Sequence, residues 1–287
     1  MTTARIDARF DALKAEGRAG FVAYVMAGDP SREEALEVLR GLPAAGADII
    51  ELGFPFSDPM AEGPPIQRAA LRGLKAGLTL KGTLDLAAAF REGDADTPLI
   101  LMGYLNPIES YGYGAFARDA AAAGVDGCIV VDCPPEEADP LSDALDAVSV
   151  SLIRLATPTS DDARLEVIAR RTSGFVYYVS VAGVTGVKEA QSASVAPAVE
   201  RVRRASGLPV AVGFGVKTPE RAAEIARVAD AVVAGSVLVD EVAAALEAGE
   251  PVAARVLARV RALGDAVRGA RVGETVLGSS PRMTTRV

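Results

Sequence analysis

Eight short apolar runs, each followed by a segment with helical periodicity, constrain the fold of this chain more than any other feature. The runs cover residues 21–27, 49–52, 99–102, 128–131, 151–155, 175–179, 210–212 and 231–234. Strands that are apolar along their whole length are typical of a parallel sheet covered by helices. Eight such units in about 250 residues predict a (β/α)₈ TIM barrel. A doubly wound open sheet is the alternative, although it usually has fewer strands.

The helical patterns fill the spaces between these runs. One pattern covers 3–16, and a second begins at the capping pair Ser31 and Glu34. The others lie at 66–76, 83–92, 114–123, 136–146, 161–171, 193–206, 219–228, 237–247 and 251–268. The first pattern predicts an extra N-terminal helix, and the long step after the second strand predicts an insertion there. No linker or change of composition marks a boundary, so we expect one barrel domain over 1–287. The polar tail 278–287 should be frayed.

Histidine is absent from the sequence, and this restricts the possible chemistry. Without it the usual serine-protease triad and most catalytic zinc sites are excluded. The two cysteines, Cys128 and Cys133, are too few for a zinc site, so we expect no metal. Proton transfer would have to use carboxylates, tyrosine, lysine or cysteine.

Net charge and hydropathy restrict the possible binding partners of the protein and its place in the cell. The net charge is −8 and the pI is near 4.9, which argues against nucleic acid or an anionic membrane as the main partner. No apolar run reaches transmembrane length, and the first residues lack the apolar segment of a signal peptide. We therefore expect a cytoplasmic protein.

Acidic side chains cluster around the end of the second strand. Glu51 stands near the end of the run 49–52, and the Pro- and Gly-rich loop that follows carries Asp58 and Glu62. In a barrel this face holds the active site, so Glu51 is a candidate for proton transfer. Two alternatives remain open at this point: Glu51 could pair with a nearby arginine or lysine, and the loop could be an ordinary surface loop.

Glycine-rich turns follow the sixth, seventh and eighth strands, at 182–186, 213–217 and 235–236. Glycine lets backbone amides approach an anion closely, and barrels often bind phosphate after strands seven and eight. The three turns together indicate a phosphorylated ligand held mainly by amides. Gly186 and the polar residues after it also suggest a loop that closes over the substrate.

Several of these segments resemble the motifs of the tryptophan synthase alpha chain family. They are E-L-G-F-P-F-S-D-P-M-A-E-G-P at 51–64, G-Y-L-N-P at 103–107, A-G-V-T-G at 182–186, G-F-G-V at 213–216 and A-G-S at 234–236. The resemblance runs from Phe10 to about Arg268. It implies a lyase of tryptophan biosynthesis that cleaves indole-3-glycerol phosphate into indole and glyceraldehyde 3-phosphate by a retro-aldol reaction. It also implies a beta chain as partner, in an α₂β₂ assembly. The pyridoxal phosphate belongs to that partner, so we expect no cofactor in this chain.

The resemblance also assigns roles by position. Glu51 would be the principal catalytic carboxylate, Glu62 the second one, and Tyr177 a tyrosine beside the catalytic acid. The other assignments are Tyr24, Ile66, Met102 and Ile129 for the indole pocket, Gly186, Phe214, Gly215, Gly235 and Ser236 for phosphate, Thr185 for the closing loop, and Pro55, Asp58, Asn106 and Pro134 for the partner interface. From pattern alone, the indole-pocket residues would be assigned to the core.

The implied chemistry requires a carboxylic acid that can protonate indole C3, and burial raises the pKa of a carboxyl group. We therefore expect Glu51 to be buried and Glu62 to be less so. Glu62 stands where the family normally has Asp, and Val181 where a basic residue is common. Glu62 is the feature that favours one alternative, a weakly active chain that mainly activates a beta chain. A further alternative is another phosphosugar barrel enzyme, such as an isomerase.

Overall fold

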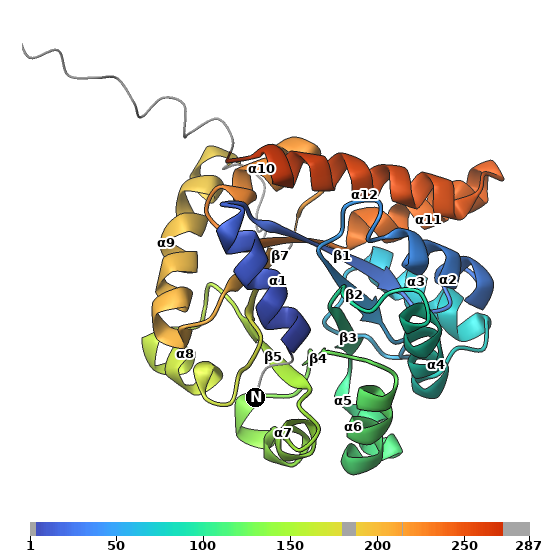
Figure 1. Ribbon diagram of the computed structural model, residues 1–287, viewed down its shortest axis with the longest axis horizontal. Coiled ribbons are helices and arrows are strands. Elements are labelled where there is room, and N and C mark those ends of the chain that lie inside the picture. Colours follow the sequence, from blue (N-terminus) through green and yellow to red (C-terminus); the bar gives the residue numbers. More distant parts are fainter. Residues whose placement is uncertain (1–3, 180–187, 214, 272–287) are drawn as a thin grey trace, which may run out of the picture.

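The computed structural model describes residues 4–179, 188–213 and 215–271, and these residues form a closed barrel of eight parallel strands (Figure 1). The strands are β1 (Gly20–Met26), β2 (Ile49–Gly53), β3 (Leu99–Gly103), β4 (Gly127–Val130), β5 (Ser151–Ala156), β6 (Val176–Val179), β7 (Val210–Gly213) and β8 (Ala231–Ala234). Each strand pairs with the next in sequence, and β8 returns to β1. The predicted TIM barrel is confirmed, and the open sheet is excluded.

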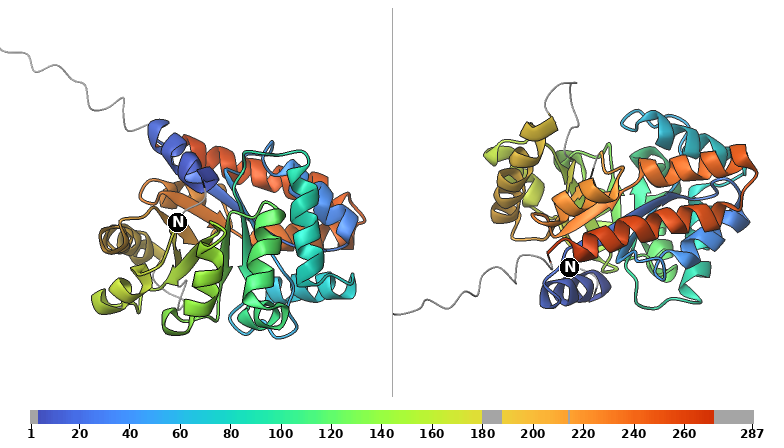
Figure 2. Two further views of the ribbon diagram at one scale, coloured as in Figure 1. Left: turned by 60° about the horizontal axis from the view of Figure 1, so that its bottom comes forward. Right: turned by 90° about the horizontal axis from the view of Figure 1, so that it is seen from above.

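The helices surround the strands, as the two further views show (Figure 2). They are α1 (Ala4–Ala15), α2 (Arg32–Gly41), α3 (Pro64–Lys75), α4 (Leu80–Arg91), α5 (Leu105–Tyr111), α6 (Tyr113–Ala122), α7 (Asp139–Asp146), α8 (Asp162–Ala169), α9 (Lys188–Ser206), α10 (Pro219–Ala226), α11 (Ser236–Ala248) and α12 (Val252–Gly269), with a 3₁₀ turn η1 (Pro135–Glu137). Ser31 caps α2 as predicted, because its Oγ accepts a hydrogen bond from the Glu34 amide at 3.2 Å.

The helices differ from the prediction at two places. The helix α5 was not predicted, because it is only seven residues long and its Asn106-Pro107 pair has the pattern of a turn. The single helix predicted at 136–146 is divided into η1 and α7. Pro140 is the second residue of α7, a first-turn position where a missing N–H costs no helical hydrogen bond.

Side chains alternate between the barrel interior and the helix layer, even though nearly all of them are apolar. One buried cluster fills the interior with residues such as Val22, Ile49 and Ile100, while another lies between the strands and the outer helices. The helix α1 closes the N-terminal end of the barrel, because its Ile6, Phe10 and Leu13 belong to the interior cluster. The Phe10 and Phe175 rings lie 5.7 Å apart there.

Three aspartates brace this N-terminal end. Asp48, Asp126 and Asp230 each stand directly before an even-numbered strand, and each accepts a hydrogen bond from a backbone amide of the preceding strand. The amides belong to Phe21, Leu99 and Val210, at 2.9, 2.8 and 2.8 Å. Each aspartate also pairs with an arginine, namely Arg18, Arg91 and Arg203 respectively. The braces therefore hold the end of the barrel opposite to the candidate site.

No helix in the described part of the chain is both long enough and apolar enough to span a membrane. Within the same residues, no group of three or more His, Cys, Asp or Glu side chains is arranged to hold a metal ion.

Candidate active site

A cavity of about 390 Å³ opens at the C-terminal ends of the strands, on the face where barrel enzymes carry their chemistry. Its walls come from β1, β2, β3, β6 and β8, from the loops that follow β2, β7 and β8, and from the first residues of α3 and α11. The lining residues are Tyr24, Glu51, Glu62, Gly63, Pro64, Pro65, Ile66, Met102, Tyr177, Gly215, Val216, Lys217, Val233, Gly235 and Ser236. The volume falls in the range of small-molecule sites.

Glu51 is the buried acid of this cavity. Its position on β2 is in register with Tyr24 of β1 and Ile100 of β3, and its side chain is only 1% exposed. Neither carboxylate oxygen has a hydrogen-bond partner among the described residues. The alternative of a structural ion pair therefore receives no support in this part of the chain. Burial, with a smaller contribution from the charge of Glu62, raises the pKa of Glu51 to about 8.

Glu62 reaches the same cavity from the loop after β2, and it is partly exposed. This confirms the expected order of burial between the two acids. Burial also raises the pKa of Glu62 above its ordinary value. The two carboxyl groups have different environments, a pattern that is typical of residues with different catalytic roles.

The loop that carries Glu62 is held at several points. The Tyr104 hydroxyl accepts a hydrogen bond from the Ala61 amide at 2.9 Å, and the Tyr104 ring stacks on Phe56 with centroids 5.3 Å apart. On the other side, the side-chain amide of Gln67 donates a hydrogen bond to the Glu62 carbonyl oxygen at 2.9 Å. These contacts fix the backbone immediately before and after the second acid.

Two buried tyrosines form part of the cavity wall, and glycines make room for them. A side chain at Gly53 would collide with the Tyr24 hydroxyl, and one at Gly213 would collide with the Tyr177 hydroxyl. Burial, together with the charges of the two acids, raises the pKa of both tyrosines well above 10, so both stay neutral. The wall around Glu51 is therefore aromatic and uncharged.

Two turns that precede helices also line the cavity. Gly215, Val216 and Lys217 follow β7, and Gly235 and Ser236 stand at the start of the 13-residue helix α11. Gly215 has a φ of +74°, a conformation that favours glycine. Unsatisfied amides and the positive end of the helix dipole make such a terminus suitable for a phosphate group.

Among the described residues that the sequence analysis assigned to the substrate, all except Ile129 line this cavity. Ile129 is fully buried in the interior cluster with Val22 and Ile49, which lie two residues before Tyr24 and Glu51 on their strands. It therefore fills the barrel beneath the cavity instead of lining it. Thr185, Gly186 and Phe214 lie outside the described residues, as do Val181 and the tail 278–287.

The four residues assigned to a partner interface differ in exposure. Asp58, Asn106 and Pro134 are exposed, each on a loop or short helix at the C-terminal face. Pro55 is buried, and it lies close to Gly73 of α3. It therefore supports the loop from within and offers little surface to a partner.

Sequence reasoning missed Lys217 and Val233 as lining residues. Lys217 ends the second glycine-rich turn, so its place beside a predicted phosphate site was a usable signal. Val233 could have been found from the two-residue period of β8, which turns it inward with Ala231.

Comparisons with known proteins agree on one family. The family model of the tryptophan synthase alpha chain matches residues 10–268. The chain is 75% identical to the tryptophan synthase alpha chain of Phenylobacterium zucineum, over 94% of this chain and 98% of the relative. It is 71% identical to that of Caulobacter vibrioides NA1000, over 95% and 99%. Among solved structures, tryptophan synthase subunit alpha of Legionella pneumophila superimposes with a TM-score of 0.87 at 41% identity, covering 93% of this chain and 99% of that one.

Proposed function

The chain belongs to the tryptophan synthase alpha chain family, and from this premise we propose how its own residues carry out the reaction. It is a carbon–carbon lyase of tryptophan biosynthesis, which converts indole-3-glycerol phosphate into indole and glyceraldehyde 3-phosphate. The observation that carries the mechanism is the buried, unpartnered carboxyl group of Glu51, whose pKa is about 8. At neutral pH this group is mostly a neutral acid, as a proton donor must be.

In the proposed mechanism, Glu51 first donates its proton to C3 of the indole ring. The bond from C3 to the glycerol chain then breaks, and its electrons return to the ring while the adjacent hydroxyl becomes an aldehyde. The Glu51 carboxylate takes the proton of that hydroxyl and is restored to its acid form. One carboxyl group thus accounts for both transfers without net gain or loss of protons.

Glu62 is proposed to face the indole N–H. Protonation at C3 places positive charge on the ring nitrogen, and a carboxylate near it stabilises that charge in the transition state. Tyr24, Ile66 and Met102 provide the apolar walls for the ring, and Tyr177 borders Glu51. Thr185 is proposed to position the closing loop over Glu62.

The phosphate group is proposed to lie against Gly215, Gly235 and Ser236, together with Gly186 and Phe214. The N-terminus of α11 supplies a favourable dipole there, and Lys217 adds a positive charge at the rim. This arrangement would fix one end of the substrate, so that C3 reaches Glu51 in a reactive position.

Members of this family work with a beta chain, which carries the pyridoxal phosphate. For this chain we propose an α₂β₂ assembly in the cytoplasm, with no cofactor of its own. Asp58, Asn106 and Pro134 are the exposed residues proposed to meet the partner. Pro55 would act by holding the loop from inside.

Glu62 is the residue that favours a second candidate function, the activation of a beta chain by a weakly active alpha chain. Its carboxylate stands one methylene further from the backbone than that of the aspartate usual in the family, and catalytic geometry is sensitive to shifts of about 1 Å. The chain could therefore be weakly active and serve mainly to activate a beta chain.

Measuring indole release from indole-3-glycerol phosphate tests both possibilities. The assay compares the isolated chain with the chain plus beta chain, and Glu51→Gln serves as the inactive reference. Turnover in the complex well above that of the variant supports the lyase. No turnover above this reference, even with beta chain present, would leave only the activating role.

A further inference from the structure

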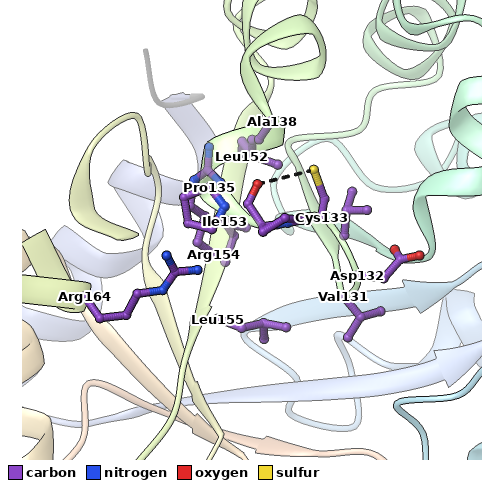
Figure 3. A pocket seen from close by; sticks show the side chains of 12 residues that line it. Val131, Asp132, Cys133, Pro135, Ala138, Leu152, Ile153, Arg154, Leu155 and Arg164 are labelled. Atoms are coloured by element: carbon purple, nitrogen blue, oxygen red, sulfur yellow. Dashed lines mark hydrogen bonds between the residues drawn. The ribbon is translucent and has the colours of Figure 1, made fainter. Parts of the chain in front are cut away.

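A second cavity, of about 260 Å³, lies outside the barrel wall beside β4 and β5 (Figure 3). Arg154 of β5 lines it, together with Leu152, Pro134 and Ala138. Ile153 and Leu155 pack with the barrel interior, so Arg154, between them on the strand, projects from the opposite face. This cavity shares no lining residue with the one that contains Glu51.

Arg154 is a buried cation for which the described residues provide no partner. The residue is 6% exposed, its Nε atom is buried without a hydrogen bond, and no ion pair joins its guanidinium to any described residue. Burial lowers the pKa of Arg154, yet an arginine side chain stays protonated in proteins. A buried charge without a partner is strongly destabilising, so an anion at this position would be stabilising.

The acidic side chains around the cavity are engaged elsewhere. Glu136 pairs with Arg164, and Asp139 pairs with Arg171 at 2.8 Å. Asp132 accepts a hydrogen bond from the Leu105 amide at 2.7 Å, and in Figure 3 it lies on the side of the cavity away from Arg164.

The thiol of Cys133 gives no counter-charge either. Burial raises its pKa above the ordinary value, so the thiol stays neutral. It contacts the Pro134 carbonyl oxygen at 3.9 Å, as drawn in Figure 3. Arg154 is therefore a cation in this cavity, and the acidic side chains near it are bound to other groups.

We propose that this cavity binds a small organic acid, whose carboxylate pairs with the guanidinium of Arg154. A guanidinium offers parallel donors that match the two oxygens of a carboxylate. Leu152 and Ala138 provide apolar walls for the body of the ligand, and Pro134, which is also proposed to meet the beta chain, lines the same cavity. Arg164, which reaches toward the cavity from α8, is balanced by its pair with Glu136, so Arg154 is the cation that faces the ligand.

The test uses benzoate and inorganic phosphate as probes on the full chain in a buffer free of other oxyanions. Each titration is run with and without indolepropanol phosphate, which fills the first cavity, so that probe bound in the first cavity is identified. Binding is measured by calorimetry and by the rise in melting temperature that a ligand specific for the folded state produces. Arg154→Met removes the charge and keeps the length, and Arg170→Met is the matched control at an exposed arginine beyond α8.

We expect one benzoate per chain, at least tenfold weaker binding in Arg154→Met, and no change in Arg170→Met. Without probe, Arg154→Met should melt at the same temperature as the unsubstituted chain or higher, because an unpaired buried charge is gone.

Equal benzoate binding by both variants would overturn the proposal. So would a large loss of stability in Arg154→Met without probe, since it would mean that the arginine is paired within the chain. Phosphate binding without benzoate binding would overturn the organic-acid assignment. Lyase turnover of Arg154→Met should stay normal, which separates this site from the catalytic one.

Discussion

Replacing Glu51 by glutamine should change how the stability of the protein depends on pH. In the folded chain the pKa of Glu51 is about 8, against an ordinary value of 4.5, and burial is the main cause. The folded state therefore holds this proton more tightly than the unfolded state does. Below about pH 4.5 both states are protonated, and the group makes no pH-dependent contribution to stability.

Between these two pKa values the unfolded chain releases the proton while the folded chain keeps it, so stability falls as pH rises. Each unit of difference in pKa corresponds to about 1.36 kcal/mol, which gives a total loss of about 5 kcal/mol by pH 8. Glutamine has the same shape and no charge, so it removes this loss. Its buried amide carries a cost of about 1–3 kcal/mol that does not vary with pH.

Urea unfolding of both proteins from pH 4.5 to 9 would measure this difference. The chain contains no tryptophan, so far-ultraviolet circular dichroism is the suitable signal. The stability of Glu51→Gln relative to the unsubstituted chain should increase by several kcal/mol across this range. Glu247→Gln, at an exposed position of α11, should show no such trend. Parallel stability curves for Glu51→Gln and the unsubstituted chain would refute the reasoning.

Four further outcomes follow from the site and the fold. Glu51→Gln should abolish indole release, whereas Glu62→Asp should retain or improve it; comparable activity in all three proteins would contradict the assigned roles. Single-turnover cleavage should be constant near pH 6.5 and fall as pH rises through about 8, because the donor Glu51 ionises there; a rate that rises over this range would exclude an acid role. Tyr104→Phe removes the acceptor of the Ala61 amide, a bond worth about 1 kcal/mol, and should slow turnover about fivefold while the melting temperature changes little; unchanged turnover would show that the loop does not need this bond. Asp126→Ala should destabilise the chain by about 3–5 kcal/mol in urea unfolding, since it removes the buried carboxylate that binds Arg5, Arg91 and the Leu99 amide; a loss below 1 kcal/mol would show that the brace is not needed.

The barrel could be predicted from the sequence because its strands are apolar throughout and its helices have clear polar faces. The prediction failed where local signals conflict. The turn-like Asn106-Pro107 pair concealed α5, whose short length gives periodicity little room to show. The boundaries of α3 and α4 were placed two to three residues late, because Pro64 and Leu80 precede the first strongly periodic residues.

The acids of the site could be predicted because charged residues are rare inside a barrel. Glu51 interrupts an apolar strand, and only a functional or paired role explains that interruption. The depth of Ile129 could not be predicted, because nothing in its strand distinguishes the layer that meets the substrate from the layer beneath it. Arg154 was missed for a related reason, since a period-two pattern does not reveal which buried cations lack a partner.

The helix α1 has a consequence for the order in which the molecule is completed. Its side chains pack against strands from both halves of the sequence, yet it is the first described element to be synthesised. Its binding surface does not exist until β8 has joined β1, so the beginning of the chain must wait for nearly all of the rest. Docking of this helix is therefore a marker of barrel closure, and chains that end before β8 should leave Phe10 and its neighbours open to proteases.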